Sequence, residues 1–501
     1  MRAVAASLLL TFVAPLPQAP QVTIAQGRLS GALEGGVAVF KGIPYAAPPV
    51  GALRWRAPRP ASGWSGVRDA TAFGPVCPQH ATEGAAARAH LPQSEDCLTL
   101  NVWTTDPHPS APRPVMVWIH GGGLSQGGSA LPIYDGAALA RRGVVVVSFN
   151  YRLGRLGFFA LPALTAEAAG EPVGNYGLLD QVAALRWVQA NVAAFGGDPA
   201  SVTVFGESAG GVSVDALMAS PLARGLFARA ISESGPALFG TVPLAEAERA
   251  GLAEAARLGA GAADALAALR AVSADSILEG GEDILEPIVD GKVLTEDVAA
   301  AFARGDVARV PYLTGTNSDE GSLLRGGTPG FLTERLGQRL ASVRAMYGKG
   351  GALSDADFAR ALFNDQFFAA TSRLFAASVA RAGEPAFVYR FRFMPAILRA
   401  RGAPGVPHGG EIPFVFGFGR LAPYAPPRDL AVLEMVQAYW ANFAKTGDPN
   451  GAGLPPWPRF EGPAPQTLVI DDTTAAVADF RKEQTDVALR LWSARSGLPL
   501  P

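Results

Sequence analysis

The chain has 501 residues, of which 49% are hydrophobic and 9% aromatic, enough apolar material for a sizeable core. It carries 42 Lys and Arg against 44 Asp and Glu, without a block of like charge, so nothing in its charge suggests a nucleic-acid partner. The length allows several average domains or one large domain with insertions, and the order of the elements has to decide between them.

The chain begins with Met1-Arg2 and a short apolar stretch from Ala3 to about Leu16. One positive charge before such a run is typical of a secretory signal, and the run is too short for a comfortable membrane span. We therefore expect residues 1–19 to be a signal peptide, the protein to be exported (periplasmic or secreted), and no stable membrane insertion. The alternative is a peripheral N-terminal extension.

Cys77 and Cys97 are the two cysteines of the sequence. In an exported protein such a pair suggests a disulfide, which would close a loop of about twenty residues and contribute roughly 3 kcal/mol through loop entropy. In a cytoplasmic protein the pair would instead be two reduced, partly buried thiols. The leader favours the disulfide.

Apolar, β-rich runs alternate with helical spacing in the first two thirds of the chain. The runs lie at residues 115–119, 144–148, 201–205, 228–232 and 310–314, and helical spacing covers 178–192 and 209–218. This alternation predicts an α/β fold with a mostly parallel central sheet flanked by helices.

Residues from about 240 to 400 are richer in alanine and in helical spacing, as in 245–272 and 355–382. No Ser/Gly/Pro linker sets this part apart. We expect residues 20–501 to form one catalytic domain, with helical insertions at about 240–400 that shape the substrate pocket. Arg390 and Arg392 alternate with aromatic residues over 386–393, which favours a strand with one wet face.

The strongest local signal is Gly206-Glu207-Ser208-Ala209-Gly210, between a predicted strand and a predicted helix. This context makes a G-x-S-x-G match a nucleophile elbow, a turn so tight that small residues must flank the serine. The pattern alone would also fit a plain glycine-rich loop. With its flanks, it predicts Ser208 as a nucleophile.

A second glycine cluster, His120-Gly121-Gly122-Gly123, follows the predicted strand 115–119. Acyl transfer places negative charge on a carbonyl oxygen, and fixed backbone N–H groups stabilise that charge. An H-G-G-G turn supplies such donors together with the amide after the nucleophile. The expected oxyanion hole is therefore Gly122, Gly123 and Ala209. A phosphate-binding Walker loop is excluded, because no Gly-Lys-Ser/Thr follows.

A serine nucleophile needs a base and an acid behind it. The sequence has five histidines, and His408 is the one that follows Ser208, as the Ser–acid–His order of this fold requires. The best acid is Glu320, in a loop just after the predicted strand 310–314, but spacing alone leaves Asp319 as a direct rival. The histidines show no metal-ligand spacing, and we expect neither a metal nor a cofactor.

These residues, in this order, resemble the type-B carboxylesterases, the family of bacterial para-nitrobenzyl esterases, animal carboxylesterases and cholinesterases. Further matches span nearly the whole mature chain: Phe40 to Ala46, Ser94 to Val102, Phe195 to Pro199 and Asn442 to Pro449. The resemblance implies the α/β-hydrolase fold and a small-molecule ester as substrate, hydrolysed through a covalent acyl-enzyme intermediate.

The resemblance also implies roles for single residues. It favours Glu320 over Asp319 as the acid and implies a Cys77–Cys97 bridge. It further implies ion pairs Arg54–Glu95 and Arg152–Asp180, and supporting positions for Glu207 and Ser234 behind the histidine.

One departure from the cholinesterases concerns substrate choice. Their loop between the two cysteines carries an aromatic residue that binds a cation, whereas residues 78–96 of this chain contain no Trp, Tyr or Phe. Choline esters are therefore disfavoured. The alternatives to simple ester hydrolysis are a preference for amides, carbamates or bulky natural esters such as toxins, and a catalytically inactive binding or adhesion module.

Overall fold

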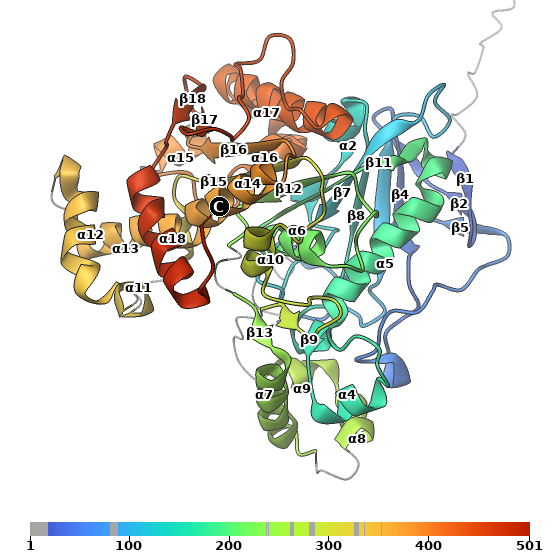
Figure 1. Cartoon of the computed structure of the whole chain (residues 1–501). Helices are drawn as coiled ribbons and strands as arrows, with labels where there is room; N and C mark the ends of the chain where they lie inside the picture. Colours follow the sequence, from blue (N-terminus) through green and yellow to red (C-terminus); the bar gives the residue numbers. More distant parts are fainter. Residues whose placement is uncertain are drawn as a thin grey trace, which may run out of the picture.

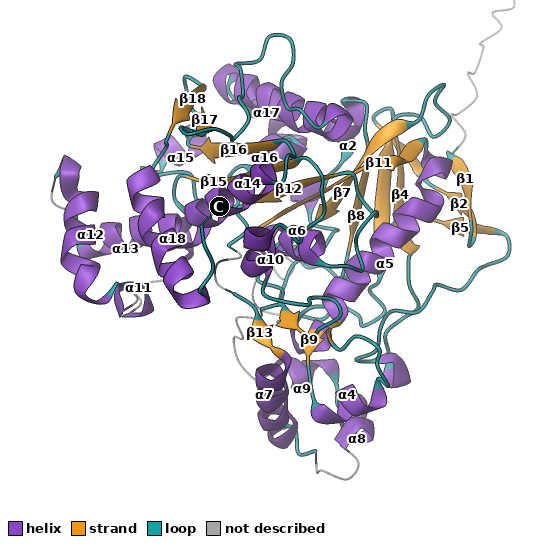
Figure 2. Ribbon diagram, viewed as in Figure 1, coloured by secondary structure: helices purple, strands orange, loops and turns teal. Residues whose placement is uncertain are grey.

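The computed structural model describes residues 19–80, 89–236, 238, 240–260, 265–279, 286–324, 330–334, 336–351 and 353–500. A large twisted sheet runs through the molecule, with helices on both of its faces (Figures 1 and 2). The expected signal peptide at 1–19 lies, except for Ala19, outside the described residues. None of the described helices combines the length and the apolarity that a bilayer span requires.

The main sheet has eleven strands in the order β18-β17-β16-β15-β12-β11-β7-β8-β6-β4-β3. The seven strands from β17 to β8 run parallel to one another, whereas β18 pairs antiparallel with β17, and β6, β4 and β3 extend the other edge through antiparallel pairs. In chain order the bounds are β3 (Ala32–Glu34), β4 (Val37–Pro44), β6 (Thr99–Thr104), β7 (Arg113–Ile119), β8 (Val145–Phe149), β11 (Gly197–Glu207), β12 (Arg229–Glu233), β15 (Tyr312–Asn317), β16 (Ala386–Phe391), β17 (Gln466–Ile470) and β18 (Ala475–Ala478).

Three small sheets complete the strands. One joins β1 (Gln21–Ile24), β2 (Gly27–Ser30) and β5 (Val67–Asp69), and two pairs are β9 (Phe158–Phe159) with β10 (Gly174–Asn175) and β13 (Val242–Pro243) with β14 (Ile288–Val289).

The central strands are buried on both faces, which explains their continuous apolar sequence. Within β7, Val115 and Val117 belong to one hydrophobic cluster while Met116 and Trp118 belong to another, because successive side chains point to opposite faces. The five predicted strands and the alternation with helices are confirmed.

The helices cover both faces of the sheet and its ends (Figure 1). Their bounds are α2 (Ala137–Arg141), α3 (Gly154–Gly157), α4 (Pro162–Glu167), α5 (Tyr176–Asn191), α6 (Ala209–Ala219), α7 (Leu244–Arg257), α8 (Ala265–Ala271), α9 (Ala274–Leu278), α10 (Val298–Arg304), α11 (Gly330–Glu334), α12 (Leu340–Tyr347), α13 (Asp355–Phe363), α14 (Ala370–Arg381), α15 (Ala396–Ala400), α16 (Ile412–Phe416), α17 (Pro427–Thr446) and α18 (Lys482–Ser496).

The segment from 240 to 400 contains many helices, as expected, but it also contributes strands β15 and β16 to the main sheet. Figure 1 shows α7 to α9 beside α4 and α11 to α13 beside α18, on two separate sides of the molecule. The continuous helical pattern over 355–382 becomes two α-helices joined by η8 (Asn364–Ala369), a π-helical segment.

Strand β16 corrects one expectation. All six of its residues are buried, and only 6% of Arg390 is exposed, so the predicted wet face does not exist within the strand. The alternation was misleading because β16 lies inside the sheet, between β15 and β17, with helices over it. The side chain of Arg392, just past the end of β16, is half exposed and pairs with Asp471.

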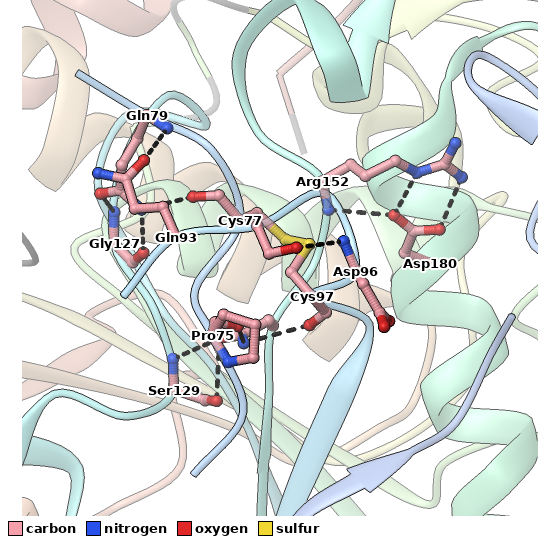
Figure 3. The surroundings of a disulfide bond; sticks show 12 residues. Pro75, Cys77, Gln79, Gln93, Asp96, Cys97, Gly127, Ser129, Arg152 and Asp180 are labelled. Atoms are coloured by element: carbon pink, nitrogen blue, oxygen red, sulfur yellow. Dashed lines mark hydrogen bonds and ion pairs between the residues drawn. A yellow bond between two sulfur atoms is a disulfide. The ribbon is translucent and has the colours of Figure 1, made fainter. Parts of the chain in front are cut away.

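The N-terminal third is held by a disulfide and two buried ion pairs, all three as expected. Cys77 and Cys97 are bonded (Figure 3). Arg54 binds Glu95, and Arg152 binds Asp180 through two nitrogens, at 2.8 and 2.7 Å. The Gln79 side chain bonds both the N–H and the carbonyl of Gly127, which ties the disulfide loop to the glycine-rich turn that begins at His120.

Candidate active site

Ser208 occupies the sharp turn between β11 and α6. Its φ of 58° and ψ of −123° lie in a region that non-glycine residues rarely adopt. A Cβ on Gly206 would lie 2.6 Å from Gly210, and a Cβ on Gly210 would lie 2.1 Å from the carbonyl oxygen of Ile119. Only glycine therefore fits on either side of the turn, as the elbow motif predicts.

The second glycine cluster lies directly beside this serine. A Cβ on Gly121 would lie 3.1 Å from Cβ of Ser208. Gly122 and Gly123 have φ angles of 111° and 63°, and the carbonyl of Gly122 accepts hydrogen bonds from Ser125 and Gln126. Ala209 is the first residue of α6, so its N–H has no partner within the helix.

His120 holds the glycine-rich turn in place through its ring and its backbone carbonyl. Its ring is buried, stacks on Tyr151 and lies with Nδ1 2.8 Å from the carbonyl oxygen of Gly121. The Tyr151 hydroxyl donates to the carbonyl of His120. Burial lowers the pKa of His120 to about 4, so the ring is neutral at ordinary pH and Nδ1 serves as a hydrogen-bond donor to Gly121.

His408 and Glu320 meet although 88 residues separate them. Nδ1 of His408 lies 2.6 Å from Oε2 of Glu320. The other oxygen, Oε1, accepts from the Ser234 hydroxyl at 2.6 Å and from the Asn317 N–H at 2.5 Å. Glu320 is fully buried, and both of its carboxylate oxygens are therefore held in place by hydrogen bonds from the protein.

The other ring nitrogen of His408 points toward the serine turn. Nε2 lies 3.2 Å from Oε1 of Glu207, the residue before Ser208, and has no hydrogen-bond partner among the described residues. Burial opposes protonation of the His408 ring, but Glu207 and then Glu320 outweigh it and raise the pKa to about 9.

Asp319, the rival acid, points elsewhere. Its carboxylate pairs with Arg360. Of the other histidines, His80, His90 and His108 are exposed at the surface. The structure therefore brings His408 together with Glu320 and Glu207, and Glu320 together with Ser234, while Ser208 directly follows Glu207 in the turn.

The site also contains acidic residues that the sequence analysis missed. Glu411 accepts from the Asn317 amide, and Glu233 accepts from Nε1 of Trp440 at 2.9 Å. Burial, followed by neighbouring carboxylates, raises the pKa of Glu411 to about 8 and that of Glu233 well above its usual value. Glu411 stands only three residues after His408, so its nearness to the site could have been inferred from the sequence. Glu233 reaches the site because β11 and β12 are neighbours in the sheet, which the sequence does not show.

Two adjoining cavities, with volumes of about 370 and 180 Å³, lie against α18. Both are lined by Leu238, Trp492 and Arg495, and Gln366 lines the smaller one. Their lining, within the described part of the chain, does not include Ser208, His408 or Glu320.

A central strand that delivers a serine into a strained turn ahead of a helix, in a mixed sheet with helices on both faces, is the architecture of the α/β-hydrolases. The carboxylesterase family matches residues 18–334 and 338–488. A solved PNB esterase superposes with a TM-score of 0.81 at 36% identity, covering 93% of this chain and 99% of that one.

Proteins of similar sequence point to the same family. The fumonisin B1 esterase of Sphingopyxis macrogoltabida is 40% identical, over 87% of this chain and 83% of that protein. The para-nitrobenzyl esterase of Bacillus subtilis (strain 168) is 38% identical, over 92% and 97%, and the pig (Sus scrofa) liver carboxylesterase is 38% identical, over 88% of each. The chain belongs to the carboxylesterase family. It is an enzyme that hydrolyses carboxylic esters.

Proposed function

We propose that Ser208, His408 and Glu320 are the catalytic triad of this esterase. The observation that carries the proposal is the 2.6 Å contact between Nδ1 of His408 and a carboxylate oxygen of Glu320, with Nε2 turned toward the elbow that holds Ser208. Glu320 holds the imidazole in one tautomer and stabilises the imidazolium that forms during the reaction. Glu207 and Ser234 support the ring and the acid.

The reaction proceeds in two halves. The Ser208 hydroxyl attacks the ester carbonyl as His408 takes its proton, and the N–H groups of Gly122, Gly123 and Ala209 stabilise the oxyanion. His408 then protonates the leaving alcohol, which leaves an acyl group on Ser208. A water molecule, deprotonated by His408, attacks this acyl-enzyme, and the acid departs as Ser208 regains its proton.

The substrates are small-molecule esters. Choline esters are disfavoured, because the loop of residues 78–96 carries no aromatic residue to bind a quaternary ammonium. The second candidate, hydrolysis of bulky natural esters such as toxins, is favoured by the similarity to a fumonisin B1 esterase.

We also propose that the protein is exported and that residues 20–501 form a single catalytic domain. The Cys77–Cys97 bridge supports export, since disulfides persist in oxidising compartments. The placement of β15 and β16 in the main sheet supports a single domain, since the segment 240–400 supplies part of the core.

The test is Ser208→Ala, assayed with para-nitrophenyl acetate and with a fluorophosphonate probe. We expect a folded protein without turnover and without labelling, while the control Ser201→Ala, at a half-buried serine of β11, keeps both. Full activity in Ser208→Ala would refute the assignment. A wild-type protein that is folded, unlabelled and inactive would favour the binding-module alternative. A panel of acetyl, bulky-acyl, amide and carbamate substrates then ranks the remaining alternatives.

A further inference from the structure

Arg390 is a buried cation with no carboxylate partner in direct contact within the described part of the chain. It lies in β16, between β15 and β17, and only 6% of it is exposed. Burial lowers the pKa of its guanidinium to about 10, which still leaves it charged at neutral pH. An unpaired buried charge is costly, so its retention calls for a reason.

Two hydrogen bonds of Arg390 lead to the end of β15 and to the turn that follows it, just before Glu320. Nη1 donates to the Thr316 hydroxyl at 2.6 Å, and Nη2 donates to the carbonyl of Ser318 at 3.2 Å. Thr316 faces Arg390 in the register of β15 and β16. The guanidinium thus fixes the end of β15 and the turn after it, immediately before the acid.

A third bond reaches the acid by way of Asn364. Nη2 of Arg390 donates to Oδ1 of Asn364 at 3.0 Å, and the same oxygen accepts the N–H of Glu320 at 3.3 Å. Asn364 begins the π-helical segment η8, and π-bulges often occur at functional sites. Phe368 of that segment packs its ring edge-on against His408, so η8 contacts both the acid and the base.

The charges around Arg390 act on it without direct contact. Asp365 attracts the guanidinium first and Glu320 after it. Of the other charged groups near Arg390, Asp365 is already paired with Arg481, and Arg392 with Asp471. Across a small adjoining cavity lie Arg373, Asp479 and Lys482.

We propose that Arg390 is the positioning residue of the triad acid: it fixes the Glu320 loop directly and through Asn364. The inference rests on the proposed role of Glu320. It assigns to a side chain outside the reacting set a function in the geometry of the acid.

The test compares Arg390→Met, Arg390→Lys and Asn364→Leu with the control Arg392→Met, which removes the same charge two residues along the chain. Misplacing the acid should lower kcat by about 10²-fold in Arg390→Met and in Asn364→Leu, with KM changed by less than about twofold. Arg390→Lys, which keeps a donor at this position, should recover part of the lost kcat, and Arg392→Met should leave both kcat and KM unchanged.

Circular dichroism, thermal melting and the fraction labelled by a fluorophosphonate give the folded, competent fraction of each variant. If Arg390→Met fails to fold, Arg390→Lys and Asn364→Leu carry the test through kcat. Unchanged kcat per labelled site in Arg390→Met and Asn364→Leu, or a loss that appears in KM instead of kcat, overturns the proposal. Because Ser208→Ala is assayed alongside, an active Ser208→Ala refutes the triad, whereas an inactive one beside a fully active Arg390→Met refutes only the role of Arg390.

Discussion

The Nε2 atom of His408 lies 3.2 Å from a carboxylate oxygen of Glu207, the residue that precedes Ser208. The base therefore stands between two acids, with Glu320 on its Nδ1 side and Glu207 on its Nε2 side. Two negative neighbours favour the imidazolium, which is the charged form that arises as the serine loses its proton. The same pair makes the enzyme sensitive to pH, because a histidine that is already protonated cannot act as a base.

Glu207→Gln should move the acid limb of the kcat/KM profile to lower pH. Glu207 contributes to raising the pKa of His408 to about 9, and its removal lets that pKa fall toward the ordinary value of 6.5. The limb should shift by about one pH unit or more. The measurement is kcat/KM for para-nitrophenyl acetate from pH 5 to 10. Glu434→Gln, at an exposed ion pair with Arg142, serves as control. An unmoved limb would mean that Glu207 does not act on the base.

Glu320→Gln and Asp319→Asn should differ strongly in turnover. The amide that replaces the Glu320 carboxylate would favour the wrong histidine tautomer, and the comparable change in a serine protease lowers kcat by about 10⁴-fold. Asp319 instead pairs with Arg360, so Asp319→Asn should stay within about tenfold of the wild type. Steady-state kinetics on both variants, with melting curves to verify folding, decides between the two acids. If Asp319→Asn lost far more kcat than Glu320→Gln, Asp319 would be the acid of the triad.

Gly210→Ala should lower the free energy of unfolding far more than Gly225→Ala does. A Cβ at position 210 would meet the Ile119 carbonyl at 2.1 Å, whereas a Cβ at 225 meets nothing within 4 Å. We expect the free energy of unfolding to fall by about 3 kcal/mol for Gly210→Ala, because of the clash, and by about 1 kcal/mol for Gly225→Ala, because of the positive φ at that position. Urea unfolding measures both. Similar losses would show that the turn after Ser208 has room to adjust.

The sequence predicted the parts of the site that obey local rules. The glycines around Ser208, the H-G-G-G turn and the scarcity of histidines are readable because each reflects a short-range steric or chemical requirement. Glu320 was separable from Asp319 only by resemblance, since both follow the same strand.

The parts that were missed depend on contacts between distant segments. The alternation of arginines and aromatic residues over 386–393 predicted a strand with an exposed face that would include Arg390. Such alternation shows which residues share a face of the strand, but it does not show whether helices cover that face. The π-helical turn at Asn364 continues a helical pattern, so its extra residue leaves no mark in the sequence. Glu233 joins the site only because β11 and β12 are neighbours in the sheet.

The sulfur bridge in the N-terminal third has a further consequence. Cys77 and Cys97 are 1% and 0% exposed, so a thiol reagent reaches them only after the surrounding segment opens. Once closed, the bond is protected by the packing that it helps to hold. A molecule that forms the bond under oxidising conditions therefore keeps it in reducing surroundings for as long as that segment stays closed. The presence of the disulfide then shows in which compartment the molecule folded.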